Sequence, residues 1–324
     1  MVLRAPSAYP RGMDRRSWLM LLVLGAIWGA SYMFIKIGVR DLSPAMVAWS
    51  RIALAAIVLA GLAAARGTLG GLGGRAGTLT LVGAVQVAGP FLLISAGEEE
   101  ISSSLAGILV TSAPLFTALL AIWVDHEERS QGLRLGGILL GVVGVAVLLG
   151  VDLGGSGNEL LGGLAVVLAG LGYAVGGLIV KHRLSDAPPI GVAAWVMVAS
   201  TVLLAPVAAA TLPSSAPGLG PVASVAVLGV LGTGIAFAIF YDLIARVGPA
   251  RAFIVTYLAP GFAVVYGATL LDEAIAATTL VGLALILAGS WLAAEGRLPG
   301  RERPGEHEPP ARPPAEAAAT DVYG

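Results

Sequence analysis

Residues 26–56, AIWGASYMFIKIGVRDLSPAMVAWSRIALAA, contain two apolar segments on either side of a short polar break at Arg40 and Asp41. A helix needs about 20 apolar residues to cross the roughly 30 Å hydrocarbon layer of a bilayer, and each segment continues beyond the quoted stretch to that length. This stretch therefore predicts two transmembrane helices joined by a short connection.

The same alternation of apolar segment and polar break continues over most of the chain. Segments such as 135–150 and 279–294 are apolar on every side of a helix, so they need lipid rather than water around them. We predict an all-α integral membrane protein with ten transmembrane helices. The expected spans are residues 18–38, 44–64, 77–97, 103–124, 133–151, 160–180, 189–210, 221–241, 251–271 and 275–294.

The composition favours a membrane protein and argues against several other classes. Of the 324 residues, 57% are hydrophobic and 12% are charged, whereas a soluble domain carries roughly 25% charged residues. The net charge is −1, and no run of Lys and Arg alternates with aromatic residues, so we expect no nucleic-acid partner. The chain has no Cys, which removes thiolate metal sites and Cys nucleophiles.

The ends of the chain differ from the apolar part. We expect residues 1–16 to form a cytoplasmic leader, and the first apolar segment to remain as a helix, since it is too long for a removable signal peptide. Residues 297–324 are rich in Pro, Glu, Arg and Ala, so they cannot bury enough apolar area to fold. They are predicted to be a disordered cytoplasmic tail.

Basic residues mark alternate connections and thereby predict the orientation of the chain. Lys and Arg near the spans prefer the cytoplasmic side. We therefore expect a multi-pass protein of the plasma membrane with both termini in the cytoplasm. The connections on this side carry Arg11, Arg15, Arg16, Arg66, Arg75, Arg129, Arg134, Lys181, Arg183, Arg246, Arg251, Arg297 and Arg301. The opposite connections carry Lys36 and Arg40.

The second half of the sequence repeats the landmarks of the first half in the same order. We therefore expect two similar five-helix units at residues 17–151 and 159–294. Because five is odd, the two units enter the membrane from opposite sides, an inverted repeat that is typical of secondary transporters with alternating access. A shift of 145 or 146 residues pairs Lys36 with Lys181, Asp41 with Asp186, Pro44 with Pro189, Gly83 with Gly229, Pro114 with Pro260, and Glu127 with Glu273.

These features together resemble a known family. The run at 26–56, the Ala-Pro pairs at 113–114 and 259–260, the acidic turns DHEER and LDEA, and the Gly-rich closing spans are similar to those of the drug/metabolite transporter superfamily, EamA type. The resemblance implies a ten-helix inverted-repeat transporter that moves amino acids, metabolites, nucleotide sugars or drugs, often outward. The second copy departs from the first at the positions of Trp28 and Arg51, where it has Tyr173 and Val196, so we do not expect a strictly symmetric site.

No arrangement of residues predicts catalysis or a cofactor. The three His residues, His126, His182 and His307, lie in short connections and in the tail, and none has metal-ligand spacing. We therefore expect no catalytic residues, no metal and no cofactor. A membrane hydrolase or transferase that used the 125–127 connection remains an alternative.

Arg51 is the charged residue that draws most attention. It lies about 10 Å into the second span, at about 1.5 Å per residue from Pro44. A charge at that depth costs several kcal/mol unless it is paired or hydrated, so Arg51 is a candidate functional residue. A snorkelling side chain or a structural salt bridge is the alternative. By topology its candidate partners are Glu98, Glu99 and Glu100. Lys36, near the end of the first span, is expected to be an interfacial anchor.

Two prolines predict where a solute pathway could lie. Pro114 and Pro260 fall near the middle of the fourth and ninth spans, where proline removes a backbone donor and opens the helix. Broken helices of this kind commonly line the cavity of a transporter, although a simple packing kink is the alternative. The predicted substrate-binding residues are Trp28, Tyr32, Arg51, Gln86, Thr111, Pro114, Tyr173, Thr233, Tyr241, Tyr257 and Pro260.

The sequence thus predicts a secondary transporter that exports a small organic solute, such as an amino acid, a metabolite or a drug-like molecule. No GxxxxGK[ST] motif occurs, so the chain carries no ATPase of its own. The expected partners are the solute and the lipid bilayer, with a proton as a candidate coupling ion and a homodimer as a candidate assembly. A membrane channel and a membrane enzyme are the alternatives.

Overall fold

The structure is a computed structural model that describes residues 13–124, 132–152 and 157–295. These residues form helices without strands, which confirms the predicted all-α class. Eight helical stretches are long and apolar enough to cross a membrane, and two shorter apolar helices, 255–270 and 277–293, complete the set of ten expected spans. The leader and the Pro-rich tail lie outside the described residues, apart from the first residues of α1.

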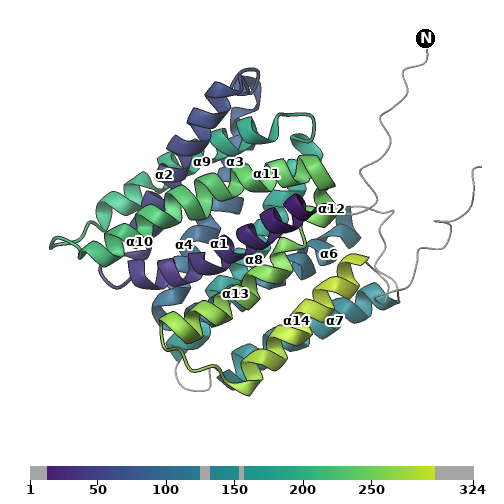
Figure 1. Ribbon diagram of the computed structural model, residues 1–324. Helices are drawn as coiled ribbons and strands as arrows, with labels where there is room; N and C mark the ends of the chain where they lie inside the picture. Colours follow the sequence, from purple (N-terminus) through teal and green to yellow (C-terminus); the bar gives the residue numbers. More distant parts are fainter. Residues whose placement is uncertain (1–12, 125–131, 153–156, 296–324) are drawn as a thin grey trace, which may run out of the picture.

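The spans follow one another in the predicted order (Figure 1). In the first half they are α1 (Arg15–Gly38); α2 (Pro44–Ala65); η1 (Gly73–Arg75) with α3 (Ala76–Val82), η2 (Gly83–Ala88) and α4 (Gly89–Glu100); α5 (Ser103–Leu109) with η3 (Val110–Ser112) and α6 (Ala113–Val124); and α7 (Leu133–Val147) with η4 (Leu148–Asp152). In the second half they are α8 (Gly157–Arg183); α9 (Pro189–Ala210); α10 (Leu219–Gly229) with η5 (Val230–Ile235) and α11 (Ala236–Val247); α12 (Pro249–Ala252) with α13 (Val255–Leu270); and α14 (Ala277–Glu295).

Polar side chains fix where several of these helices begin. Asp14 accepts a hydrogen bond from the backbone N–H of Ser17 at 2.9 Å, and the hydroxyl of Ser43 accepts one from Met46 at 3.2 Å. Ser102 does the same for α5 through the N–H of Leu105. Each cap satisfies an N–H that has no partner within its own helix, so the starts of α1, α2 and α5 are set by the local sequence.

Two irregular turns occur at equivalent places in the two halves. The π-helical turns η2 and η5 interrupt the third and eighth spans 147 residues apart. A Cβ added at Gly83 would lie 3.1 Å from the carbonyl oxygen of Val196, and one at Gly229 would lie 3.0 Å from that of Arg51. The same pair of glycines thus lets η2 approach α9 and α10 approach α2, so the inverted repeat extends to the packing.

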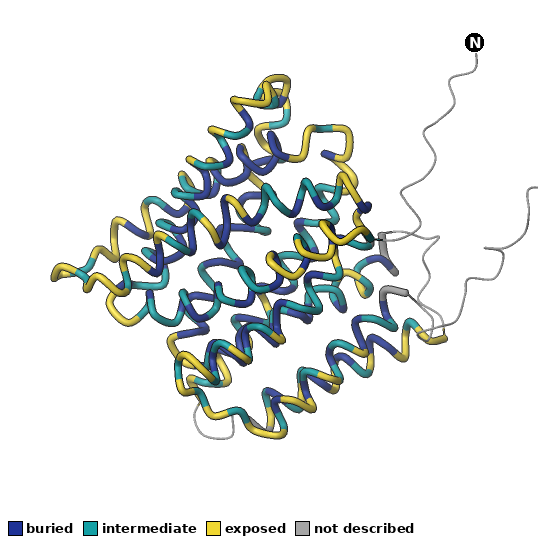
Figure 2. Tube along the Cα trace, in the orientation of Figure 1, coloured by how far each residue is buried: buried dark blue, intermediate teal, exposed yellow. Residues whose placement is uncertain are grey.

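The helices of the two halves interlock across the molecule. The second span packs against the seventh, α1 against α13, and α4 against α8, while α7 and α14 form a pair at one side (Figure 1). Large apolar side chains stay exposed, for example Leu139 at 59% and Val202 at 68%. Figure 2 shows exposed and buried positions alternating along many of the helices. In a bilayer the exposed apolar side chains would face lipid.

The connections lie on two faces that are named here by their basic residues. The neutral face carries the connections at 39–43, 101–102, 211–218 and 271–276, and the basic face carries those at 66–72, 184–188 and Gly248. In Figure 1 the 211–218 connection lies at the left and α12, which follows Gly248, at the right. The prediction that the basic face is cytoplasmic stays a prediction.

Candidate functional site

Arg51 lies in the interior of the described helices, with 7% of its surface exposed. Its Nε donates a hydrogen bond of 2.8 Å to the hydroxyl of Thr233 on η5, and its guanidinium carbon lies 3.8 Å above the ring centre of Phe91 on α4. The hydroxyl of Thr233 in turn donates to the carbonyl of Leu228, in the π-helical region. Residues from two other spans thus hold the guanidinium in one orientation.

Two tyrosines complete this central group. Tyr32 on α1 and Tyr173 on α8 both interact electrostatically with Arg51 and with each other. Both side chains are half-buried and pack against the same apolar cluster around Ile94. The structure therefore brings together four of the predicted residues, Tyr32, Arg51, Tyr173 and Thr233, and adds Phe91 to them.

Arg51 makes no direct ion pair with its predicted partners in the part of the chain that the structure describes, although Glu98 lies within electrostatic reach of it. None of the described salt bridges joins Arg51 to Glu98, Glu99 or Glu100, and its hydrogen bond goes to Thr233 instead. Glu99 and Glu100 are exposed on the last turn of α4, whereas Glu98 is fully buried. The order of the spans correctly predicted that α4 lies beside α2. It could not predict the direction of each side chain.

Lys36 binds the end of α4, and the prediction that it anchors the first span at the bilayer interface stays a prediction. Its Nζ donates to the carbonyl oxygens of Glu98 at 2.5 Å and of Ile101 at 2.9 Å. These are carbonyls of the last turn of a helix, which lack partners within the helix and attract a positive charge. Lys36 therefore caps α4 and joins it to α1.

A second group of predicted residues is aromatic and lies nearer the basic face. Trp28 on α1 contacts Phe237 and Phe240, with ring centres 6.0 and 5.2 Å apart, and Tyr241 packs against the same two rings. Trp28 and Tyr241 are half-buried. Offset and tilted rings at these distances attract one another, so the group forms a continuous aromatic wall between α1 and α11.

The remaining predicted residues lie elsewhere. Thr111 donates to the carbonyl of Ile108 in its own helix, and its own carbonyl accepts from Ser290 of α14 at 3.3 Å. The ring of Tyr257 packs against Trp291 of α14, with ring centres 6.3 Å apart. Thr111 and Tyr257 thus sit toward α14. Gln86 lies in the π-helical turn η2 and packs over Gly176 of α8.

The two mid-span prolines mark departures from regular helix. A 3₁₀ turn at Val110–Ser112 precedes Pro114, which lies in the first turn of α6. Pro260 lies inside α13, and Phe253 and Ile254 separate this helix from α12. The prediction that these prolines line a solute cavity stays a prediction.

Glu273, on the connection between α13 and α14, ties the second half of the chain to the first. Its carboxylate accepts hydrogen bonds from the N–H of Ser103 at 2.7 Å, the N–H of Ser104 at 3.0 Å and the hydroxyl of Ser104 at 2.5 Å. Burial raises the pKa of Glu273, but the hydrogen bonds from Ser104 and Ser103 outweigh this effect and leave the pKa below its usual range. The ionised carboxylate therefore links the two halves of the chain at the neutral face.

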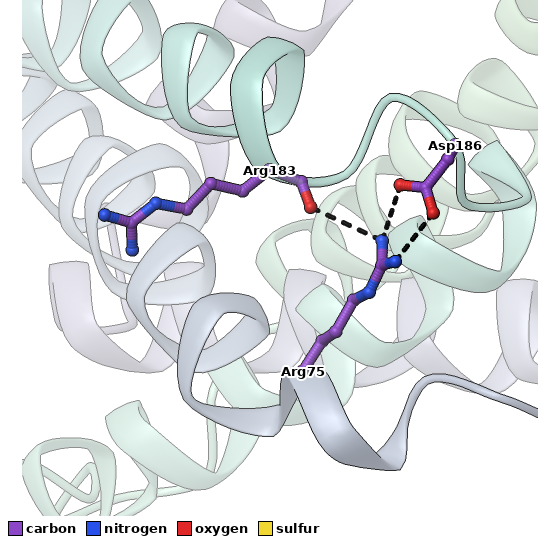
Figure 3. A network of polar contacts seen from close by, with 3 residues as sticks. All are labelled: Arg75, Arg183 and Asp186. Atoms are coloured by element: carbon purple, nitrogen blue, oxygen red, sulfur yellow. Dashed lines mark hydrogen bonds and ion pairs between the residues drawn. The ribbon is translucent and has the colours of Figure 1, made fainter.

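Two aspartates that the repeat pairs make equivalent links on opposite faces. Asp41 accepts a hydrogen bond of 2.8 Å from the N–H of Gly218 at the neutral face. Asp186 binds Arg75 at the basic face through bonds of 2.7 and 2.6 Å, and Arg75 also donates to the carbonyl of Arg183 (Figure 3). The hydrogen bonds from Arg75 lower the pKa of Asp186 to about 2.

The broken fourth and ninth spans meet at the neutral face and not to the same extent at the basic face. The helix α5 packs against α13, where a Cβ added to Gly107 would lie 2.6 Å from the Cβ of Ala263. Within the described residues, α6 has no comparable packing against α12 or α13. The fourth and ninth spans therefore pack against each other more closely toward the neutral face.

A cavity of about 220 Å³ opens near the neutral face, away from the central group. Its walls include Glu100, Leu105, Glu159 and Thr279, and Arg51 is not among them. Position alone does not make it the solute site, since it lies at the surface connections. The buried Arg51 group has the more specific chemistry.

Sequence reasoning missed Phe91 and did not separate Glu98 from its neighbours. Phe91 and Glu98 are seven residues apart, or two helical turns, so they lie on the same side of α4. That spacing was visible in the sequence. The link from Glu273 to Ser103 and Ser104 joins residues about 170 positions apart and left no local signal.

Comparisons with known proteins point to membrane transporters. The model of the EamA-like transporter family matches residues 16–150 and again residues 160–294. The chain is 29% identical over 284 residues to a protein of Streptantibioticus cattleyicolor named as a probable terminal-alkyne amino-acid exporter, covering 86% of this chain and 93% of that protein. It is 26% identical over 291 residues to a probable amino-acid metabolite efflux pump of Escherichia coli K12, covering 86% and 95%.

More distant similarity supports the same architecture. An uncharacterized transporter of Archaeoglobus fulgidus is 25% identical over 287 residues, which cover 87% of this chain and all of that protein. A solved crystal structure superimposes with a TM-score of 0.61 over 87% of this chain and 98% of that chain. At 20% identity, this likeness shows the fold alone.

Proposed function

This chain belongs to the EamA-like transporter family, and on that premise we propose that it is a secondary transporter that exports a small amino-acid-like solute by alternating access. It is a multi-pass membrane protein related to transporters. In the proposed mechanism, Arg51 binds the carboxylate of the solute.

The observation that carries this proposal is the state of the Arg51 guanidinium. Its Nε is held by Thr233, but within the described residues its two terminal nitrogens make no hydrogen bond to the protein. A buried guanidinium without a counter-ion costs several kcal/mol, and its planar fork matches a carboxylate in two parallel hydrogen bonds. A solute carboxylate would satisfy both the charge and the free donors.

The surroundings of Arg51 suit such a solute. Phe91 supports one side of the guanidinium, and the half-buried Tyr32 and Tyr173 supply hydroxyl groups that can donate to a carboxylate. The names of two relatives refer to export or efflux of amino acids or their metabolites. This agrees with a solute that carries a carboxylate on a small organic body.

Alternating access is supported by the links on the two faces. The Asp41 link at the neutral face and the Asp186 link at the basic face are equivalent under the repeat, so the two faces have related means of closing. The tighter packing of α5 against α13 favours a form whose neutral face is closed. We propose that opening exchanges the roles of the two faces around Arg51.

The test is solute flux in sealed vesicles that contain the purified protein. Each of the twenty common amino acids, labelled singly, is offered to the wild type, to Arg51→Ala and to Arg51→Lys. Arg66→Ala, at the exposed end of the same helix, is the matched control. We expect Arg51→Ala to abolish flux and Arg51→Lys to retain little, because Lys keeps the charge but loses the planar fork and the bond to Thr233.

A competition experiment then asks which group Arg51 recognises. For a transported amino acid such as leucine, unlabelled leucine should inhibit uptake, whereas isoamylamine, which lacks the carboxylate, should not. Unchanged flux in a folded Arg51→Ala protein, or equal inhibition by the amine, would overturn the role of Arg51. Unitary conductance in a planar bilayer would instead identify a channel.

A further inference from the structure

We propose that Glu98 is a proton-binding site, and that the proton it carries holds the neutral face closed. The proton site itself is independent of the solute, but its use to drive export rests on the function proposed above. No bond other than O–H forms or breaks, since a carboxylate takes a proton from the solution on one side and later returns it to the other.

The first observation is that Glu98 is buried without partners. Its side chain is 0% exposed, and neither carboxylate oxygen has a hydrogen-bond partner among the described residues. An ionised carboxylate has about four acceptor positions and would leave all of them unsatisfied in an interior of low polarity. The neutral acid removes the charge and reduces this cost. The geometry therefore fits a protonated Glu98.

The second observation is that the cations nearby do not neutralise Glu98 by direct contact. Lys36 on α1 uses its amine to bind the backbone carbonyls of Glu98 and Ile101, and Arg51 on α2 bonds to Thr233. Both remain within electrostatic reach of the carboxyl group, as does the anionic Glu273. The two cations favour the ionised form of Glu98 and the anionic Glu273 favours the protonated form. Because none of them contacts the carboxyl group directly, Glu98 can gain or lose a proton without breaking an ion pair.

The other elements packed around Glu98 bring apolar or hydroxyl groups. The helix α8 meets this part of α4 so closely that a Cβ at Gly97 would lie 2.6 Å from Val166 and 2.7 Å from the carbonyl of Gly162. The helix α5 contributes Ser103, whose hydroxyl is also buried without a partner. Tyr32 of α1 is a further titratable group within electrostatic reach. These contacts leave the Glu98 side chain with no exposed surface.

The third observation connects Glu98 to the closure of the neutral face. Glu98 lies near the end of α4, and the chain continues through Ile101 directly to Ser103 and Ser104, which hold the carboxylate of Glu273. Loss of the proton would place a second negative charge near Glu273 inside this closed face. Like charges in a poorly hydrated site repel, so deprotonation favours separation of these elements and entry of water. Protonation favours closure.

A solute-free measurement tests the proton site. Infrared spectroscopy of the purified protein reports the C=O stretch of a protonated, buried carboxyl group at neutral pH. We expect the band in the wild type, its loss in Glu98→Gln, and its retention in Glu99→Gln, the exposed neighbour on the same turn. Glu98→Asp, which keeps a titratable group, should restore a band. Its absence from the folded wild type, or its persistence in Glu98→Gln, would overturn the proposal.

Vesicle flux then tests the coupling. With acid on the neutral-face side, efflux of an amino acid transported by the wild type should be stimulated severalfold, and Glu98→Gln should show no stimulation while still exchanging labelled for unlabelled solute. Glu99→Gln should behave as the wild type does. Full stimulation in Glu98→Gln would overturn the coupling. A wild type that moves no amino acid would count against the proposed function, and the infrared result would still decide the proton site.

Discussion

Removal of the Glu273 carboxylate should open the neutral face. The group accepts three hydrogen bonds from Ser103 and Ser104, and it comes from the opposite half of the chain. If this link exists only in the closed form, then Glu273→Ala destabilises that form and leaves the open form unchanged. The perturbation therefore changes the ratio of two conformations rather than the fold.

The size of the effect follows from the contacts. Hydrogen bonds to a charged group contribute about 1.5–3 kcal/mol each when they are buried. Glu273 is only half-buried, and water replaces these bonds in the open form, so we take about 2 kcal/mol for the set. Since 1.4 kcal/mol is a factor of ten, the population of the open form should rise about 30-fold.

Thiol labelling measures this population directly because the chain contains no Cys. Ser103→Cys is nearly isosteric, and Ser103 is 0% exposed, so the thiol should react slowly with a membrane-impermeant maleimide in the closed form. Glu273→Ala should accelerate its labelling about 30-fold. A Cys at Leu219, which is 89% exposed, controls for the reagent and should react equally in both backgrounds.

The reasoning would be refuted by a labelling rate at Ser103→Cys that changes less than about threefold, which corresponds to under 0.7 kcal/mol. That result would mean that the Glu273 link persists in both forms or contributes little. A comparable acceleration at an unrelated buried position would indicate general unfolding instead. Glu273→Gln, which retains one carbonyl acceptor, should give an intermediate rate.

Three further predictions concern packing, pH and orientation. Gly29→Ala should lower the melting temperature, because its Cβ would overlap Phe262 and lie 2.7 Å from the carbonyl of Ala259, and overpacking costs about 1–3 kcal/mol; Gly61→Ala, with open space around it, should not. The pKa of Asp186 is lowered to about 2, so its bond to Arg75 stabilises the fold at every pH above the ordinary pKa of an aspartate. This stabilisation is lost only as the pH falls below that ordinary pKa toward about 2. The difference in melting temperature between wild type and Asp186→Asn should thus be equal at about pH 7 and about pH 5, and a decrease at the lower pH would contradict this. A reporter inserted at Ser214 should lie outside the cell, and cytoplasmic reporter activity would reverse the orientation.

The positions of the helices could be predicted because a helix that crosses the lipid must be apolar over its whole length. The expected first span at 18–38 is α1, Arg15–Gly38, and the expected second span at 44–64 is α2, Pro44–Ala65. Hydropathy alone therefore locates a spanning segment. The π-helical turn at Gly83–Ala88 could not be predicted, since one extra residue per turn leaves the composition unchanged.

The candidate site was less accessible to prediction. Arg51 was identifiable because a lone charge within an apolar span is costly. Its contact with Thr233 joins residues 182 positions apart and depends on how α2 and η5 approach each other, which no local pattern specifies. Proximity in the topology favoured Glu98–Glu100 instead. In the structure Glu99 and Glu100 are exposed, and the buried carboxyl group of Glu98 has no hydrogen-bond partner among the described residues.

The two kinds of position in the repeat suggest a division of roles. Asp41 and Asp186 are identical and form links on opposite faces, so the repeat keeps this pair of linking residues the same. At the centre, Arg51 faces η5 with a charge, while its counterpart Val196 lies beside Gly83 as an apolar side chain. A mechanism that interconverts two related forms needs similar closures at both faces, but a solute with one carboxylate has no two-fold symmetry and needs one guanidinium. Under the proposed function, the asymmetry at the centre is therefore what a small polar solute requires of a scaffold whose two halves exchange roles.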